Sequence, residues 1–382
     1  MRRLLPLLLL VLIPVPSAAL ADGCPPSSCG TTSVAPPGSP VAFVRPNGQQ
    51  GPAEAFSLAD GNRSFRLPVG VLAADGRTYA STSVVKVLHG KRTFLRRYSA
   101  RTGRVRSFTA IPGSWHVTAL SADGRLAGVM QYHKRGVVVG VAGSTLRFRA
   151  NLRGNWEIEA LSPTADRVFL IHWNRTGGYT LENIDTKTHL VSPTRLDEPE
   201  EKMSGLAQGA VATRDGHWLL TLYLKANGRT FLHALDLGSG LAHCVDLPLI
   251  GDMSTVGSTA LTLSPDERRL YLASPFLGSV ITVDLADLRV AHQAAFRPLA
   301  YRQLDISVGP SAAVTRNGRM LAFSGAKTVW LYDAAYGVVR KRLRVGSKII
   351  GLGFRPRGRA LVVLPAASKS QAFDAATGEK RS

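Results

Sequence analysis

The feature that most constrains the fold of this chain is a short phrase that recurs along it, a polar turn that leads directly into an apolar strand. Its clearest copy is TLSPDERRLYLA, residues 262–273. Seven copies follow one another about 40 to 50 residues apart, at residues 71–82, 119–130, 160–171, 211–222, 262–273, 313–324 and 353–364. Repeats of this length are typical of β-propeller blades.

The residues of the phrase explain both of its parts. Ser264 stands at the first position of a type I turn and Pro265 at the second, where the fixed φ of proline fits. In other copies a glycine, such as Gly124 or Gly216, closes the turn. The strand that follows is apolar on both faces, so we expect it to be covered on both sides.

A second phrase alternates with the first and ends a strand with an acidic or polar residue and a turn. Its copies lie at residues 98–105, 182–190, 234–242, 282–290, 331–339 and 372–380, with an eroded version at 141–148. In the better copies an Asp accepts hydrogen bonds from the turn backbone, as in short hairpin loops. Together the two phrases predict four antiparallel strands per repeat, with both sheet faces buried, which is the structure of one propeller blade.

The phrases SPDERRLYLA, ITVDLADLRV and AFDAATGEK resemble the repeats of secreted bacterial β-propellers of the YVTN and TolB-like type, which are related in shape to WD repeats. The resemblance covers about residues 41–382, and the copy number predicts an all-β, seven-bladed β-propeller. Because the seventh repeat ends just after its third strand, we expect an N-terminal strand, with RSFRLP (63–68) as the candidate, to complete the last blade and close the ring. Eight blades, with one built from more of residues 41–68, is the alternative.

The start of the chain has the pattern of an export signal. A charged beginning, an apolar run at residues 4–16 and small residues at 17–21 match a secretory signal peptide. We therefore expect residues 1–21 to be a signal peptide, residues 22–40 a disordered linker rich in Pro, Ser and Gly, and residues 41–382 the propeller, without a transmembrane segment. The expected location is outside the cytoplasm, either secreted or, as the alternative, held at the cell surface by a lipid on Cys24.

The chain has three cysteines, and in an oxidising compartment one of them must stay unpaired. Cys24 and Cys29 can close the short loop CPPSSC, which leaves Cys244 as a buried small hydrophobe. If Cys24 carries a lipid instead, Cys29 and Cys244 are the possible pair.

The composition is strongly basic, with 47 Lys and Arg against 26 Asp and Glu and a net charge of +21. Basic residues spread along the whole chain suit anionic surroundings such as an envelope polymer, a phospholipid surface or an acidic protein. The alternative is that arginine is simply the surface cation of a high-GC genome. Export, and the absence of a basic cluster with interleaved aromatics, argue against nucleic acid as a partner.

The resemblance implies that the connections between blades share one face with the loops between second and third strands, and that the repeated turns lie on the other face. Trp115 and Trp156 each lie six residues before the Ser of their turn, so we expect them at equivalent positions near the central channel, accompanied by Glu159. Aromatic and polar groups at a channel mouth indicate a binding site; the alternative is that both rings pack between blades. The predicted site consists of Trp115, His116, Trp156, Glu157, Tyr301 and Arg302.

Motifs for catalysis are absent from the sequence. It contains no H-E-x-x-H, no G-x-S-x-G and no P-loop, and its nine His residues are scattered without the spacing of metal ligands. The sequence therefore predicts a non-catalytic, monomeric propeller that binds a protein or an anionic envelope polymer and needs no cofactor or metal. The alternative, an enzyme of lactonase or lyase type with polar groups converging at the channel mouth, depends on fold analogy alone.

Overall fold

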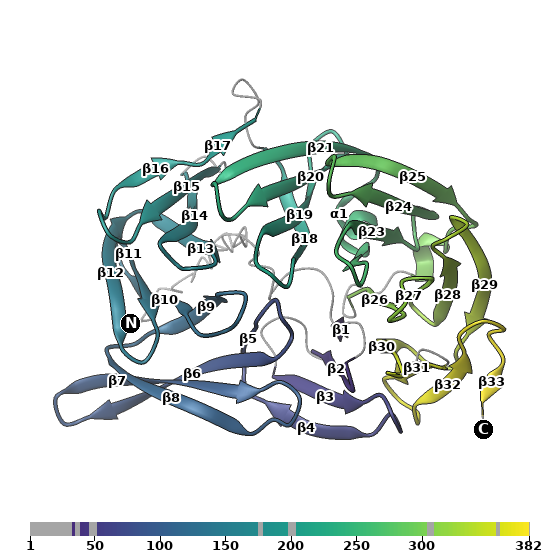
Figure 1. Cartoon of the computed structure of the whole chain (residues 1–382), viewed down its shortest axis with the longest axis horizontal. Coiled ribbons are helices and arrows are strands. Elements are labelled where there is room, and N and C mark those ends of the chain that lie inside the picture. The colour runs from purple at the N-terminus through teal and green to yellow at the C-terminus, as the bar shows by residue number, and fades with distance from the viewer. Residues whose placement is uncertain are drawn as a thin grey trace, which may run out of the picture.

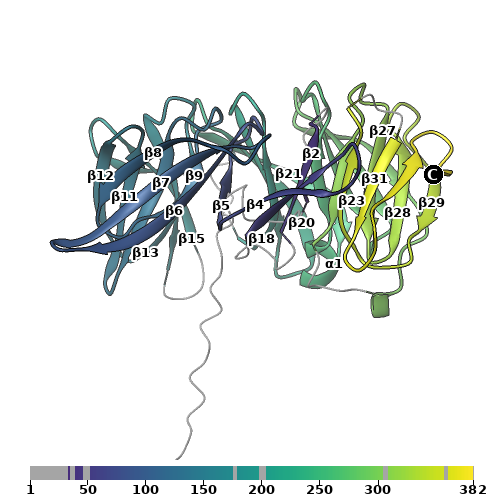
Figure 2. The same cartoon turned by 90° about the horizontal axis from the view of Figure 1, so that it is seen from below.

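The computed structural model describes residues 33–34, 39–45, 52–174, 179–197, 204–303, 309–356 and 360–381. In these residues strands dominate, with one short helix, α1 (Met253–Gly257), and one 3₁₀ turn, η1 (Tyr301–Gln303). The strands form eight antiparallel blades arranged as a ring around a central axis (Figure 1), and the ring is a flat disc when seen from the side (Figure 2). No described helix has the length and apolar character needed to span a membrane.

Each blade is built from four consecutive strands, numbered from the centre of the ring outward. Blade 1 contains β1 (Ser33–Val34), β2 (Val41–Val44), β3 (Ala53–Ser57) and β4 (Arg63–Leu67). Blade 2 contains β5 (Gly70–Leu72), β6 (Thr78–Val87), β7 (Gly90–Ser99) and β8 (Val105–Pro112). Blade 3 contains β9 (His116–Leu120), β10 (Ala127–His133), β11 (Gly136–Ala142) and β12 (Leu146–Arg153). Blade 4 contains β13 (Asn155–Leu161), β14 (Arg167–Trp173), β15 (Tyr179–Asp185) and β16 (Val191–Pro193).

The second half of the ring repeats this plan. Blade 5 contains β18 (Leu206–Ala212), β19 (Trp218–Leu224), β20 (Arg229–Asp236) and β21 (Leu241–Ile250), with β17 (Arg195–Leu196) added parallel to β21. Blade 6 contains β22 (Ala260–Leu263), β23 (Arg269–Ser274), β24 (Ser279–Asp284) and β25 (Arg289–Ala295). Blade 7 contains β26 (Ser311–Val314), β27 (Met320–Gly325), β28 (Thr328–Asp333) and β29 (Val338–Arg344). Blade 8 contains β30 (Ile349–Phe354), β31 (Ala360–Pro365), β32 (Gln371–Asp374) and β33 (Lys380–Arg381).

The β-propeller with four antiparallel strands per blade is confirmed, but the prediction of seven blades is wrong and the alternative of eight is correct. The N-terminal segment forms a blade of its own, in which RSFRLP supplies β4 and pairs with β3. The last blade already has a fourth strand, because β33 pairs with β32. The predicted completion of the last blade by an N-terminal strand is therefore wrong as well.

The repeated turn phrase does not occur in the first blade, because the inner turn of that blade has a different sequence. In blade 2, the backbone N–H of Ala100 donates to the carbonyl of Arg77 at 2.9 Å, and in blade 1 Leu58 donates in the same way to Pro40 at 2.8 Å. Pro40 thus takes the place that Arg77 has in the next repeat. The inner strand of blade 1 is Ser33–Val34, which the sequence analysis assigned to the linker.

Side-chain packing between blades 1 and 8 joins the two ends of the ring. Ala42, Val44 and Leu58 of blade 1 form one buried cluster with Val362 and Leu364 of blade 8. The hydroxyl of Ser370 also donates a hydrogen bond to the carbonyl of Asp60 at 3.1 Å. The ring therefore closes by an apolar seam between two complete blades, and at the centre β1 also pairs in parallel with β26 of blade 7, through Ser33 and Ser311.

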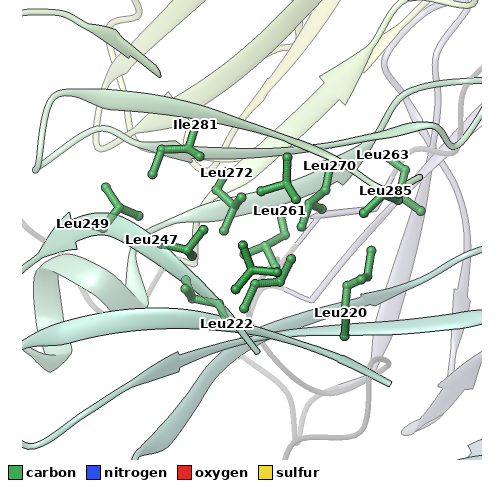
Figure 3. Close-up of a cluster of buried hydrophobic side chains, with 14 of the residues drawn as sticks. Leu220, Leu222, Leu247, Leu249, Leu261, Leu263, Leu270, Leu272, Ile281 and Leu285 are labelled. Carbon is green, nitrogen blue, oxygen red and sulfur yellow. The ribbon is translucent and has the colours of Figure 1, made fainter. Parts of the chain in front are cut away.

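Apolar side chains fill the seams between neighbouring blades. Figure 3 shows the seam between blades 5 and 6, where Leu222 and Leu247 on one side meet Leu261 and Leu272 on the other. Both Leu222 and Leu272 are fully buried. Full burial of one such side chain contributes about 2 kcal/mol, which explains why the strands are apolar on both faces.

The repeated turns have the chemistry that their sequence predicts. In blade 3 the Ser121 hydroxyl accepts a hydrogen bond from the backbone of Leu126 at 2.9 Å, and in blade 6 Ser264 accepts one from Arg269 at 3.0 Å. The fourth residue of the turn has a positive φ, +70° at Gly124, which glycine adopts without strain. The turns therefore form as local units at the same edge of each blade.

Candidate functional site

The ring has two chemically different faces. Connections between blades, such as α1 between β21 and β22, lie on one face, which we call the connection face; it is at the bottom of Figure 2. The opposite face, the turn face, carries the repeated turns between first and second strands and between third and fourth strands. The sequence placed its candidate binding residues on the connection face.

Trp115 and Trp156 occupy equivalent positions, as expected from their spacing. The indole Nε1 of Trp115 donates to the carbonyl of Pro112, and that of Trp156 donates to the carbonyl of Arg153, both at 2.7 Å. Both side chains are buried, and each belongs to an apolar cluster shared by two adjacent blades. The two rings therefore pack between blades, which is the alternative that the sequence left open. A role of these rings in binding stays a prediction.

The other predicted residues are spread around the ring. His116 is exposed beside Tyr132, with ring centroids 6.1 Å apart, and Glu157 is half-buried on β13. Tyr301 and Arg302 are exposed in η1, between blades 6 and 7, on the opposite side of the ring from the connection that carries Trp115. The structure therefore does not bring all six residues into one site. Cys24 and Cys29, the predicted disulfide, lie outside the described residues.

A groove lies instead on the turn face, between blades 6 and 7. It has a volume of about 550 Å³. Its wall carries four arginines, Arg268, Arg269, Arg316 and Arg319, against two aspartates, Asp266 and Asp284. We call this site the basic groove.

Two of these arginines, Arg316 and Arg319, are exposed. Neither of them forms an ion pair within 4.0 Å among the residues that the structure describes. Their charge is therefore available to a ligand. Because guanidinium groups match phosphate and carboxylate oxygens in a two-bond geometry, the groove fits an anionic ligand.

The repeat itself produces this concentration of charge. Arg319 directly follows Gly318 of its turn, just as Arg125 follows Gly124 in blade 3, and Arg268 has the same position in blade 6. Each such residue stands on the turn face of its own blade. Adjacent blades then place Arg268 and Arg319 on one groove, although they are distant in sequence.

A second groove, of about 590 Å³, lies between blades 7 and 8 and shares Asn317 and Arg319 with the first. Here the charges are paired. Arg340 lies 3.4 Å from the carboxylate of Asp333. The backbone N–H of Thr377 and the guanidinium of Arg381 hold the pKa of Asp374 well below its usual range, so this carboxylate is fully ionised and already paired. The second groove adjoins the basic groove, and the charged residues that it adds, Arg340 against Asp333 and Asp374, contribute no positive charge.

A second candidate is a group of buried polar side chains in the seam between blades 4 and 5. Glu159 is the extra residue of a β-bulge on β13, where the pairing with β14 shifts by one residue. Its carboxyl is buried and interacts electrostatically with the phenols of Tyr179 on β15 and Tyr223 on β19. His233, on β20, lies on the same face of blade 5 as Tyr223, with ring centroids 5.9 Å apart.

Burial controls the protonation of this group. It raises the pKa of Glu159 to about 7 and, with help from the nearby His243, lowers the pKa of His233 to about 4. Both ring nitrogens of His233 and the hydroxyl of Thr221 lack hydrogen-bond partners among the described residues. Burial in the seam therefore keeps His233 neutral at neutral pH and keeps Glu159 protonated up to about pH 7, and ionising either one costs free energy.

Among the described residues, no group of three or more His, Cys, Asp or Glu side chains is arranged to hold a metal ion. The seam between blades 4 and 5 is also enclosed, since Glu159 is only 2% exposed. We therefore regard it as a determinant of stability, and the basic groove as the candidate functional site.

Sequence reasoning identified the turns of the basic groove but not their role. The turn phrase was interpreted as part of the scaffold, on the face away from the predicted site. The available signal was the basic residue that follows the turn in several copies, as at Arg77, Arg125 and Arg319. A residue that recurs at one place in a repeat recurs at one edge of the ring, where neighbouring copies come together.

Comparison with known proteins supports the fold and leaves the function open. No family model and no curated protein matches the sequence. Among solved structures, the chain is similar to the dihydro-heme d1 dehydrogenase NirN in complex with DHE, with a TM-score of 0.55 and 15% identity, over 91% of this chain and 74% of that one. At such low identity the likeness shows a shared β-propeller fold.

Two further structures match less well. The hydrazine synthase of Kuenenia stuttgartiensis has a TM-score of 0.43 and 13% identity, over 80% of this chain and 94% of that one. The Myceliophteria thermophila Cps50 (Swd1) β-propeller domain has a TM-score of 0.42 and 14% identity, over 79% of this chain and 93% of that one.

Proposed function

We propose that this chain is a non-catalytic, exported β-propeller of the YVTN and TolB-like type that binds an anionic polymer of the cell envelope. The observation that carries the proposal is the basic groove between blades 6 and 7, whose lining contains four arginines and only two aspartates. The export signal and the repeat resemblance in the sequence support the location and the type, and the net charge of +21 supports the sign of the ligand.

The shape of the site favours a polymer over a small molecule. The two grooves share Asn317 and Arg319 in their walls, and together they are lined by residues of three blades. An extended chain that carries regularly spaced phosphate or carboxylate groups can pass over both grooves and engage several arginines at once. A small anion would engage one or two of them.

The proposal is tested by the equilibrium binding of fluorescently labelled polyphosphate, with polyglutamate and neutral dextran as competitors. We expect polyphosphate to bind, polyglutamate to compete and dextran to have no effect. A charge-assisted hydrogen bond contributes roughly 1.5 to 3 kcal/mol, so the double variant Arg316→Ala/Arg319→Ala should weaken binding at least tenfold.

The matched control is Lys134→Ala/Arg135→Ala. These two residues are exposed at the tip of the β10–β11 hairpin, on the connection face, and their removal changes the net charge by the same amount. Binding that resists the substitutions in the groove, or that falls equally in both double variants, would overturn the proposal.

A further inference from the structure

The hairpin formed by β6 and β7 extends far beyond the ring. Each of these strands has ten residues, whereas the second strands of blades 3 to 8 have six or seven. Three or four extra residues at about 3.4 Å each lengthen the hairpin by roughly 10 Å. It projects past the outline of the other blades at the lower left of Figure 1 and at the left of Figure 2.

Apolar side chains occupy the projecting end. Val85 and Val87 are each more than 40% exposed, and Leu88, in the turn, is 99% exposed. Single exposed apolar residues are ordinary, but several grouped at the end of a protruding element usually mark an interaction site. None of the residues that the structure describes covers Leu88.

Positive charge surrounds this apolar tip. Lys86 lies directly opposite Lys91 across the two strands, and Arg92 lies opposite Val85. Like charges that face each other across a hairpin are destabilising. No carboxylate is near in sequence to relieve them, since residues 76–122 contain nine Lys and Arg and no Asp or Glu.

We propose that the β6–β7 hairpin attaches the propeller to the surface of an anionic lipid bilayer. Val87 and Leu88 enter the boundary between head groups and acyl chains, while Lys86, Lys91 and Arg92 contact lipid phosphates. Interfacial anchors combine buried apolar area with attraction to anionic lipids in this way. The apolar residues lie on a protruding tip and not in a groove. A broad, flat surface such as a bilayer can contact residues on a projecting tip but cannot reach into a groove.

The lipid surface is distinct from the ligand of the basic groove. The hairpin belongs to blade 2, whereas the basic groove lies between blades 6 and 7. The inference therefore does not depend on the proposed function. The β10–β11 hairpin of blade 3 again supplies the control, because its tip residues Lys134 and Arg135 are cationic and its exposed apolar residue, Tyr132, is aromatic and lies below the tip.

The test is co-sedimentation of the full chain with vesicles of phosphatidylcholine containing roughly a third phosphatidylglycerol, compared with vesicles of phosphatidylcholine alone. We expect binding to the anionic vesicles only. Each basic residue near such a surface contributes about 1 kcal/mol, so Lys86→Ala/Lys91→Ala/Arg92→Ala should lower the partition coefficient about 100-fold. Leu88→Asp should lower it at least tenfold, and Lys134→Ala/Arg135→Ala should leave it nearly unchanged.

Insertion is measured separately with Leu88→Trp. Its fluorescence should shift to the blue on anionic vesicles and be quenched by brominated lipid, whereas the parent chain should show neither change. Because residues 85–92 are exposed at the tip, these variants should keep the far-ultraviolet circular dichroism and melting temperature of the parent. Equal binding to both kinds of vesicle, no binding, or binding that the hairpin variants retain would overturn the proposal.

Discussion

Replacement of Glu159 by Gln should make the propeller more stable at high pH and leave it nearly unchanged in acid. Burial raises the pKa of this carboxyl from its usual 4.5 to about 7. Between these two values the folded protein holds a proton that the unfolded chain has lost. The folded state is therefore favoured at low pH, and this contribution to stability is lost as the pH rises through about 7.

The size of the effect follows from the difference between the two pKa values. A shift of one unit corresponds to 1.36 kcal/mol, so a rise from 4.5 to about 7 corresponds to about 3 kcal/mol. The whole shift counts towards stability, because the Glu159 side chain is only 2% exposed and solvent hardly screens its charge. The Gln side chain keeps the shape of the protonated carboxyl but cannot ionise.

The measurement is the free energy of unfolding in urea for both proteins, from about pH 4 to about pH 8. The quantity of interest is the difference between variant and parent, because His233 contributes an opposite slope to both proteins and cancels. This difference should grow in favour of the variant by about 3 kcal/mol across the range. A difference that stays constant with pH would show that Glu159 titrates normally, and would refute the account of the seam.

Three further changes test other parts of the fold. Burial lowers the pKa of His233 to about 4, so the parent protein should lose unfolding free energy as the pH drops below about 6.5. His233→Leu should make this loss smaller. An unchanged dependence of the unfolding free energy on acid pH, measured in urea, would contradict this. Gly124→Ala should lower the melting temperature clearly more than Gly318→Ala does, although both glycines have a positive φ. A Cβ on Gly124 would lie 2.4 Å from the Cβ of Thr78, whereas a Cβ on Gly318 would lie 3.4 Å from its nearest atom. Equal losses in melting temperature would contradict the close contact of the Gly124 turn with Thr78. Leu58→Ala should cost about 2 to 5 kcal/mol in urea unfolding, because it opens a cavity in the seam that closes the ring; a loss below about 1 kcal/mol would argue against closure by packing.

Local chemistry made much of the fold predictable. The Ser264 turn, like the equivalent turns in other blades, specifies a hairpin by hydrogen bonds within a few residues. The strand after each turn has apolar residues on both faces, and such a strand requires neighbours on both sides. These signals predicted a propeller of four-stranded blades. They could not count the blades, because in the first blade Pro40 replaces the usual turn residues and only the hydrogen bond to Leu58 reveals the equivalence.

The candidate site was predictable only in part, for a related reason. The equivalence of Trp115 and Trp156 followed from spacing, since both occupy the same place in their repeats. The basic groove depends on Arg268 and Arg319, which meet only because two blades are adjacent in space. The altered pKa of Glu159 depends on burial at a β-bulge, which its neighbours in the sequence do not indicate.

The central claim, that the basic groove binds an anionic polymer, is tested most directly by the salt dependence of polyphosphate binding. The slope of the logarithm of the binding constant against the logarithm of salt concentration falls by roughly 0.7 to 0.9 for each ionic contact that is removed, as for other linear polyanions. We predict that Arg316→Ala/Arg319→Ala reduces this slope by about 1.5, and that Lys134→Ala/Arg135→Ala leaves it unchanged. Equal reductions in the two double variants would show that net charge, and not the groove, attracts the polymer, and would contradict the account.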